Sequence, residues 1–213
     1  MNMSHDHDHH AAPTQTPRHP ESAQEWDERY RMSDRIWTTN VNPALLAEAD
    51  SLQPGSALDV GSGEGADARW LTGKGWAVTA VDISQVAVDR AREADPEGTI
   101  SWNRVDLTVD PIPNAPFDLV SAFYFPIPQG QRVLVDALIG AVASGGTLLV
   151  VAHEAEGMRA HGFDPADFFQ PADIASLLGD GWVVEVSEVR PRGIAAGNGA
   201  HINDEVLKAR RLA

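Results

Sequence analysis

The sequence contains no cysteine, which excludes disulfides, zinc–thiolate sites, iron–sulfur clusters and cysteine nucleophiles. Basic residues are also scarce, with 16 lysines and arginines against 31 acidic residues and a net charge of −15. A surface of this charge repels polyanions. We therefore predict that neither nucleic acid nor an acidic membrane surface is a partner of this protein.

Long apolar runs are missing as well. No run reaches the roughly 18 residues that a transmembrane helix needs, and the first residues lack the apolar segment of a secretory signal. We therefore expect a cytoplasmic protein. The hydrophobic content of 43% over 213 residues is enough for one domain with a full core.

The first 20 residues read as a disordered, histidine-rich tail, because nothing in them can form a core. Its histidines alternate with aspartates and could bind nickel or zinc weakly; they are His5, His7, His9 and His10. We interpret this segment as a solvated tail and predict no functional metal site.

The domain itself is predicted to span residues 21–213, with residues 21–52 forming an N-terminal helical cap. Helices are expected over 21–30, where Ser22 and Glu25 fit a capping box, and over 43–51. The loop between them, residues 33–40, holds Trp37 among polar groups. Two interpretations stay open for this loop: a lid over a ligand site, or a plain connector.

From residue 57 onward, apolar strand patterns alternate with helical ones. This alternation predicts an α/β fold with a doubly wound, mostly parallel, seven-stranded Rossmann-like sheet, closed by a C-terminal antiparallel hairpin. The expected strands cover 57–60, 77–81, 99–104, 117–121 and 146–152, the expected helices 67–74, 84–94, 131–143 and 171–178, and the hairpin 182–190 and 201–210 around Gly193–Gly199.

The stretch from Leu58 to Gly65, Leu-Asp-Val-Gly-Ser-Gly-Glu-Gly, predicts a strand, a tight glycine loop and then a helix. Glycines permit close approach of the backbone to a ligand at a helix N-terminus. The glycines alone also satisfy a loose dinucleotide fingerprint. The acids Asp59 and Glu64 decide more, because a pyrophosphate would face two carboxylates. A ligand with an ammonium group and no phosphate, such as S-adenosylmethionine, suits this loop better.

Further polar residues follow the next strands, at the edge where open α/β sheets bind ligands. Asp82 ends the second strand and could accept both ribose hydroxyls, although it could also only cap a helix. Asp106 follows the third strand and could accept from an adenine amine, although an isolated aspartate in a loop is often a turn residue. Ile83 and Leu107 are the apolar neighbours that could sandwich the adenine ring.

Together these segments resemble the motifs of the class I S-adenosylmethionine-dependent methyltransferases. Softer similarities at residues 26–42 and at His201-Ile202 point to a small-molecule branch with tellurite-resistance and thiopurine methyltransferase-like proteins. The matching motifs are Leu58–Gly65, Ala80–Ser84, Val105–Leu107, Phe117–Ser121 and Ser144–Leu148.

The resemblance implies S-adenosyl-L-methionine as the cofactor and assigns its parts to positions of this chain. Ser62 stands where the family often has cysteine, a change that the main-chain contacts tolerate. The implied contacts are Asp59, Gly61, Ser62 and Gly63 for the methionine moiety, Asp82 and Ile83 for the ribose and adenine, Asp106 and Leu107 for the adenine, Phe123 near the sulfonium, and Trp37 closing the pocket.

Methyl transfer of this kind is an in-line displacement that requires alignment but no metal. An amine or hydroxyl acceptor could use a general base, and the candidate bases are His153, Glu154 and Tyr124. A soft nucleophile, such as a thiol, needs none.

The segment after the fourth strand, Phe123–Pro128, lacks the acid–Pro–Pro order of nucleic-acid amino-methyltransferases, which favours a small-molecule acceptor. Two other functions stay open: a nicotinamide-dependent oxidoreductase, and a non-catalytic protein that binds cofactor or metal. Retention on NAD(P) would indicate the first, and binding without turnover the second.

Overall fold

The computed structural model describes residues 19–20, 22–192 and 203–213. Four histidines of the predicted tail lie outside the described residues, namely His5, His7, His9 and His10. The glycine-rich stretch 193–199 and His201 lie outside them as well. His19 lies inside them, with its ring stacked on Phe163 at a centroid distance of 4.3 Å.

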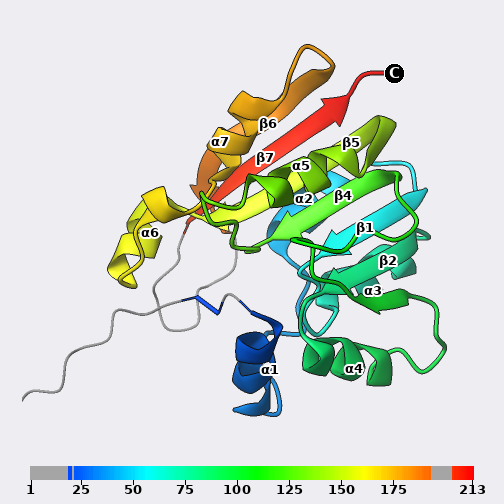
Figure 1. The fold of residues 1–213 in the computed structure, drawn as a ribbon. Helices are drawn as coiled ribbons and strands as arrows, with labels where there is room; N and C mark the ends of the chain where they lie inside the picture. The colour runs from blue at the N-terminus through cyan, green and yellow to red at the C-terminus, as the bar shows by residue number, and fades with distance from the viewer. Residues whose placement is uncertain (1–18, 21, 193–202) are drawn as a thin grey trace, which may run out of the picture.

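Seven strands form a single sheet in the order β3-β2-β1-β4-β5-β7-β6 (Figure 1). The first five strands in this order are parallel, whereas β7 runs antiparallel to both β5 and β6. The predicted fold class is confirmed. The strands are β1 Ser56–Val60, β2 Ala77–Asp82, β3 Ser101–Arg104, β4 Phe117–Phe123, β5 Val142–His153, β6 Trp182–Pro191 and β7 Asn203–Arg211.

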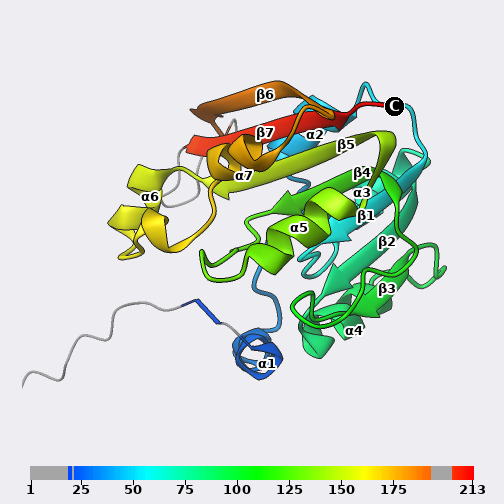
Figure 2. The ribbon, with the colours of Figure 1, turned by 45° about the horizontal axis from the view of Figure 1, so that its top comes forward.

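Helices cover both faces of the sheet (Figures 1 and 2). One apolar core lies under α5 and α7, and a second lies under α2, α3 and α4. The helices are α1 Ala23–Arg31, α2 Pro43–Ala49, α3 Ala66–Gly73, α4 Gln85–Glu93, α5 Arg132–Gly140, α6 Ala155–Ala160 and α7 Pro171–Leu177, with a 3₁₀ turn η1 over Pro165–Asp167.

The strand register brings the carboxyl ends of the central strands to one edge. Val60 of β1 lies beside Val81 of β2 and Ala122 of β4, and Ala122 in turn lies beside Val150 of β5. The loops that follow these strands therefore meet at this edge, which is where open α/β sheets bind ligands.

The fifth strand is longer than predicted, because it begins at Val142 instead of residue 146. Val142 pairs with Phe117 and Thr147 pairs with Leu119, so a bulge holds the intervening Ser-Gly-Gly segment inside the strand. Gly146 is required there, since a Cβ would lie 2.9 Å from the carbonyl oxygen of Phe117. The predicted helix before this strand ends earlier in consequence, at Gly140.

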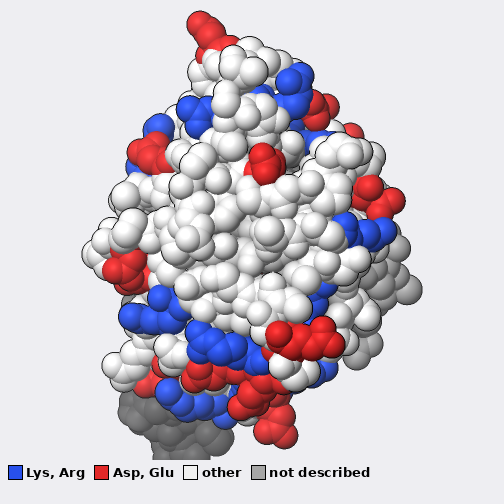
Figure 3. Space-filling view, turned by 90° about the vertical axis from the view of Figure 1, so that its right-hand side faces the viewer, with Lys and Arg blue, Asp and Glu red and all other residues white. Residues whose placement is uncertain are grey.

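The opposite edge of the sheet, where the parallel strands begin, is shown in Figure 3. Charged side chains are few at its centre, and acidic and basic groups intermix toward α1 and α4 rather than forming a basic patch. Across the described part of the chain, no helix combines the length and apolar character needed to cross a membrane.

Candidate cofactor and acceptor site

The glycine loop between β1 and α3 has the geometry that its sequence predicts. Gly61, Gly63 and Gly65 have φ values of +66°, +53° and +79°, which side chains rarely adopt. The backbone N–H groups of Gly61 and Ser62 donate to the carbonyl oxygen of Val81 at 2.9 and 3.1 Å, and this ties the loop to β2.

Two buried polar atoms in this loop have no hydrogen-bond partner among the described residues. They are Oδ2 of Asp59 and Oγ of Ser62. The other oxygen of Asp59, Oδ1, accepts from Ser121 Oγ at 3.3 Å. Since buried polar groups normally find partners, the loop is arranged for a polar ligand.

Two carboxyl groups lie close together beneath the loop. Burial and the neighbouring carboxylate of Asp67 raise the pKa of Asp59 well above its usual value of 3.8. Burial also raises the pKa of Asp67 to about 6. A cation at this position would stabilise both ionised carboxylates, whereas a phosphate would be repelled.

Asp82 ends β2 and is almost fully buried, with 8% of its surface exposed. Its Oδ2 accepts from Gly63 N at 2.9 Å and its Oδ1 accepts from Ser84 N at 2.8 Å. Burial raises its pKa to about 6 despite these two bonds. Because each carboxylate oxygen has two lone pairs, Asp82 can shape the loop and still accept ligand hydroxyls.

These raised pKa values predict that a cationic ligand binds more weakly in acid. Asp67 and Asp82 both have a pKa of about 6 and must be ionised to attract a cation. We expect S-adenosylhomocysteine to lose about tenfold in affinity between pH 7.5 and pH 5 if one of these groups must ionise. Calorimetry in buffers of different ionisation enthalpy should also detect proton release at pH 6. Equal affinity and no proton release across this range would contradict the prediction.

Asp67 and Asp82 give folding stability the opposite pH dependence, so that it falls as the pH rises. Their pKa values are higher in the folded chain than the ordinary value of 3.8. The fold therefore favours their protonated forms. This contribution to stability is complete below about pH 4 and is lost as the pH rises through about 6.

The N-terminal cap lies directly on the glycine loop. A Cβ on Gly63 would lie 3.1 Å from Tyr30 Oη and 3.2 Å from Trp37 Cδ1. Trp37 Nε1 donates to Tyr30 Oη at 2.9 Å, and its backbone N–H donates to Glu64 Oε2 at 3.2 Å. Trp37 thus contacts the loop from the N-terminal side, which favours the lid interpretation of residues 33–40.

Arg90 on α4 fastens the cap to the loop. Its guanidinium pairs with Glu64 at 3.0 Å and donates to the carbonyl oxygens of Tyr30 and Ser33 at 2.8 and 2.7 Å. The charge of Glu64 is therefore neutralised by an arginine and is not directed at a ligand. Repulsion of a phosphate from this loop therefore depends on Asp59 and not on Glu64.

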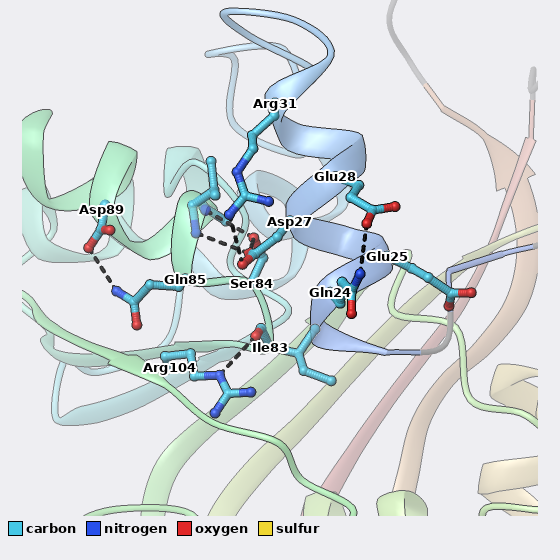
Figure 4. Close-up of polar contacts among 12 residues, drawn as sticks. Gln24, Glu25, Asp27, Glu28, Arg31, Ile83, Ser84, Gln85, Asp89 and Arg104 are labelled. Carbon is cyan, nitrogen blue, oxygen red and sulfur yellow. Dashed lines mark hydrogen bonds and ion pairs between the residues drawn. The ribbon is translucent and has the colours of Figure 1, made fainter.

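A second connection joins α1 to the start of α4, as Figure 4 shows. Asp27 Oδ1 accepts from Ser84 Oγ at 2.6 Å and from Val86 N at 3.2 Å. Helix α1 begins as its sequence predicts, because the Ser22–Glu25 capping box is formed. The cap is thus held over the end of β2 at two points.

Removing the Arg90 connection should loosen the cap. We expect Arg90→Gln to weaken S-adenosylhomocysteine binding about tenfold, because charge-assisted hydrogen bonds of this kind contribute roughly 1.5–3 kcal/mol. Calorimetry measures the affinity, and limited proteolysis reports cleavage within residues 33–40. Arg132→Gln is the control, since Arg132 is exposed and pairs with Asp136 on the same helix, α5. Unchanged affinity and unchanged cleavage in Arg90→Gln would contradict a closing role for the cap.

The three residues that the sequence predicts around the adenine lie in different surroundings. Asp106 Oδ1 accepts from the backbone N and Oγ1 of Thr108 at 3.0 and 2.6 Å, which fits the turn interpretation. Leu107 is buried in the core under α5. Ile83 keeps a partly exposed side chain at the end of β2. Of these three residues, Ile83 has the position that best fits an adenine contact.

Phe123 was predicted to lie near the sulfonium, but the structure buries its ring in the core under α2 and α3. The aromatic residue at the loop is instead Phe125, whose Cδ2 would lie 2.9 Å from a Cβ on Gly61. Strand β4 ends at Phe123, and Tyr124 turns the chain with a φ of +51°. This turn redirects the chain, so Phe125 lies at the loop and is the better-placed candidate, while the cofactor contact of Phe123 stays a prediction.

The candidate bases lie together at the ends of β4 and β5. The rings of Tyr124 and His153 stack at 4.4 Å, and Tyr124 Oη donates to Asp204 at 3.0 Å. Burial and the charge of Asp204 raise the pKa of Tyr124. Glu154 accepts from Asn203 Nδ2 at 3.0 Å. The sequence reasoning did not identify Asp204, because its role depends on a strand pairing between β5 and β7.

Comparison with known proteins agrees with this geometry. Residues 57–146 match the sequence family described as a methyltransferase domain. An uncharacterised methyltransferase of Mycobacterium tuberculosis is 34% identical over 128 residues, which is 59% of this chain. The match covers 65% of that relative and of its counterpart from Mycobacterium bovis, so the chain spans slightly less than two thirds of these curated relatives.

Solved structures share the fold at low sequence identity. The N-methyltransferase NodS from Bradyrhizobium japonicum, in complex with S-adenosyl-L-homocysteine, has a TM-score of 0.70 at 19% identity and covers 90% of this chain and 99% of its own. TehB from Haemophilus influenzae has a TM-score of 0.63 at 16% identity and covers 90% of this chain and 67% of its own. Residues 57–146 of this chain therefore match a methyltransferase domain, and the chain has the fold of the S-adenosylmethionine-dependent methyltransferases.

Proposed function

We propose that this protein is a methyltransferase that takes its methyl group from S-adenosyl-L-methionine and transfers it to a small molecule. One observation carries the proposal: the glycine loop buries Asp59 Oδ2 and Ser62 Oγ without partners, above carboxylates that favour a cation. A methionine moiety with an ammonium group supplies both the polar atoms and the positive charge that this loop lacks.

The residues of the chain would divide the binding as follows. Gly61, Ser62 and Gly63 offer backbone at close range, and Asp59 and Asp67 supply carboxyl groups that a cation would hold ionised. The ends of β2 and β4 would add the remaining contacts. In this assignment Asp82 accepts the ribose hydroxyls, Ile83 lies against the adenine, Phe125 lies at the loop and Trp37 covers the site, whereas Asp106, Leu107 and Phe123 remain weaker candidates.

The bound cofactor supplies a methyl group that is electrophilic because it is attached to a sulfonium. The protein then has to bind the acceptor in line with that methyl group and to exclude water from the site. The cap contributes to the second task, because Tyr30 and Trp37 close against Gly63.

A small-molecule acceptor is supported by charge and by sequence. The net charge is −15, so a polyanionic acceptor is disfavoured. The Phe123–Pro128 segment also lacks the acid–Pro–Pro order of base-flipping amino-methyltransferases. The aromatic and histidine side chains near β4 and β5 suit a compact organic acceptor.

A release assay for S-adenosylhomocysteine tests this proposal. The protein is incubated with S-adenosylmethionine and panels of thiols, phenols, amines and chalcogen oxyanions. We expect acceptor-dependent release with at least one panel, and none with Asp82→Ala as the matched inactive variant. Cofactor binding without release on any panel would favour a non-catalytic binder. Hydride transfer from NADH or NADPH would indicate the oxidoreductase alternative instead.

A further inference from the structure

Four side chains form a polar cluster at the ends of β4 and β5, which we call the acceptor-side cluster: Tyr124, His153, Arg192 and Asp204. His153 and Asp204 are paired residues of β5 and β7. Asp204 is almost fully buried, with 2% of its surface exposed. It accepts from Arg192 Nη2 at 2.9 Å and from Tyr124 Oη at 3.0 Å.

Arg192 is the centre of this cluster. Its guanidinium donates to Asp204 through Nε and Nη2 and lies 4.6 Å from the centroid of the Tyr124 ring. The same Nη2 lies 2.8 Å from Nδ1 of His153. The arginine is thus fixed on one side by a buried carboxylate and on another by an aromatic ring.

The contact between Arg192 and His153 determines which ring nitrogen carries the proton. An arginine guanidinium has donors only and no acceptor. Nδ1 of His153 must therefore present its lone pair to Arg192, and the single proton of the neutral imidazole must be on Nε2. A second proton at Nδ1 would face the arginine cation and would displace this hydrogen bond.

The hydrogen bonds of Tyr124 likewise make it a donor and not a base. Its hydroxyl proton is committed to the carboxylate of Asp204. A phenol that donates to a buried carboxylate is a poor proton acceptor. Two of the three candidate bases are therefore arranged as hydrogen-bond donors.

We propose that Arg192 is a positioning residue that fixes His153 in the Nε2–H tautomer and so prevents it from acting as a general base. Its relevance to the acceptor rests on the proposed function. Within the cluster, neither His153 nor Tyr124 can then remove a proton, which leaves Glu154 as the remaining candidate base and favours an acceptor that needs none, such as a thiolate.

The tautomer can be measured directly in the full-length protein without any acceptor or cofactor. Long-range ¹H–¹⁵N correlation spectra at about pH 7.5 distinguish a protonated from an unprotonated ring nitrogen. The spectrum of His153→Gln identifies the His153 signals by their loss. We expect an unprotonated Nδ1 and a protonated Nε2 for His153 in the wild-type protein.

Variants then test whether Arg192 is the cause. Arg192→Gln and Arg192→Lys should both lose the single-tautomer pattern, because neither presents the fixed guanidinium fork. Arg132→Gln on α5 should leave it unchanged, since Arg132 is paired with Asp136 on the same helix and not with a member of the cluster. If an Arg192 variant does not fold, the wild-type spectrum still decides the tautomer.

A protonated Nδ1 on His153 in the wild-type protein would overturn the proposal, and so would a single-tautomer pattern that survives in folded Arg192 variants. Failure of the proposed function would appear elsewhere, as absent binding of S-adenosylhomocysteine. The two outcomes are therefore distinguishable.

Discussion

Asp82→Ala should weaken the binding of S-adenosylhomocysteine by at least about 100-fold, because two buried N–H groups lose their acceptor and, in the proposed assignment, the ribose loses it as well. Gly63 N and Ser84 N both donate to this carboxylate, at 2.9 and 2.8 Å. Without it the glycine loop is no longer tied to the end of β2 through a side chain. Isothermal calorimetry measures the effect.

Two further variants separate binding from general damage at this position. Asp82→Asn keeps one carbonyl oxygen and should give an intermediate affinity. Asp89→Asn is the control, since Asp89 lies exposed on the neighbouring helix α4 with Gln85 and Arg92 as its partners. Wild-type affinity in a folded Asp82→Ala protein would remove Asp82 from the cofactor site.

Asp204→Ala should give a large loss of stability, about 3 kcal/mol in the free energy of unfolding. The carboxylate of Asp204 is 3% exposed and balances the charge of Arg192, which is 24% exposed. Removing one partner of a buried ion pair leaves the other uncompensated, which costs roughly 3–5 kcal/mol. Arg192 can partly reach solvent, so the lower end of this range is expected. Urea unfolding monitored by circular dichroism measures the change.

The matched control for this prediction is Asp136→Ala on α5. Asp136 and Arg132 form an i, i+4 pair with 57% and 48% of their side chains exposed. Such surface pairs contribute only about 0.5 kcal/mol. Equal, small effects in Asp204→Ala and Asp136→Ala would show that the acceptor-side cluster does not stabilise the junction of β5 and β7.

The sheet topology was predictable because its signals are local. Each buried parallel strand is a short apolar run, and each is followed by a helical pattern, so the alternation determines a doubly wound sheet. The capping box at Ser22 is likewise contained in four residues. The start of β5 was not predictable, because its bulge depends on how Val142 pairs with Phe117 across the sheet. The short helix α6 has too few residues for a periodic pattern.

The same distinction between local and long-range signals applies to the candidate site. The glycine loop and Asp82 were predicted, since strand ends and glycine spacing are visible in the sequence. Phe125 lies at the loop and Phe123 in the core because one residue with a left-handed backbone, Tyr124, changes the direction of the chain. Arg90 and Arg192 were missed, since their partners are distant in sequence. The limits of the domain and the residues that bind the cofactor stay predictions.

The most direct measurement is calorimetric titration of the wild-type protein with S-adenosylhomocysteine, with NADH and NADPH titrated in parallel. The buried carboxylates beneath the glycine loop and its two unpartnered polar atoms predict saturable binding of S-adenosylhomocysteine and none of either dinucleotide. Binding of NADH or NADPH with no binding of S-adenosylhomocysteine would contradict the proposed cofactor and, with it, the proposed function.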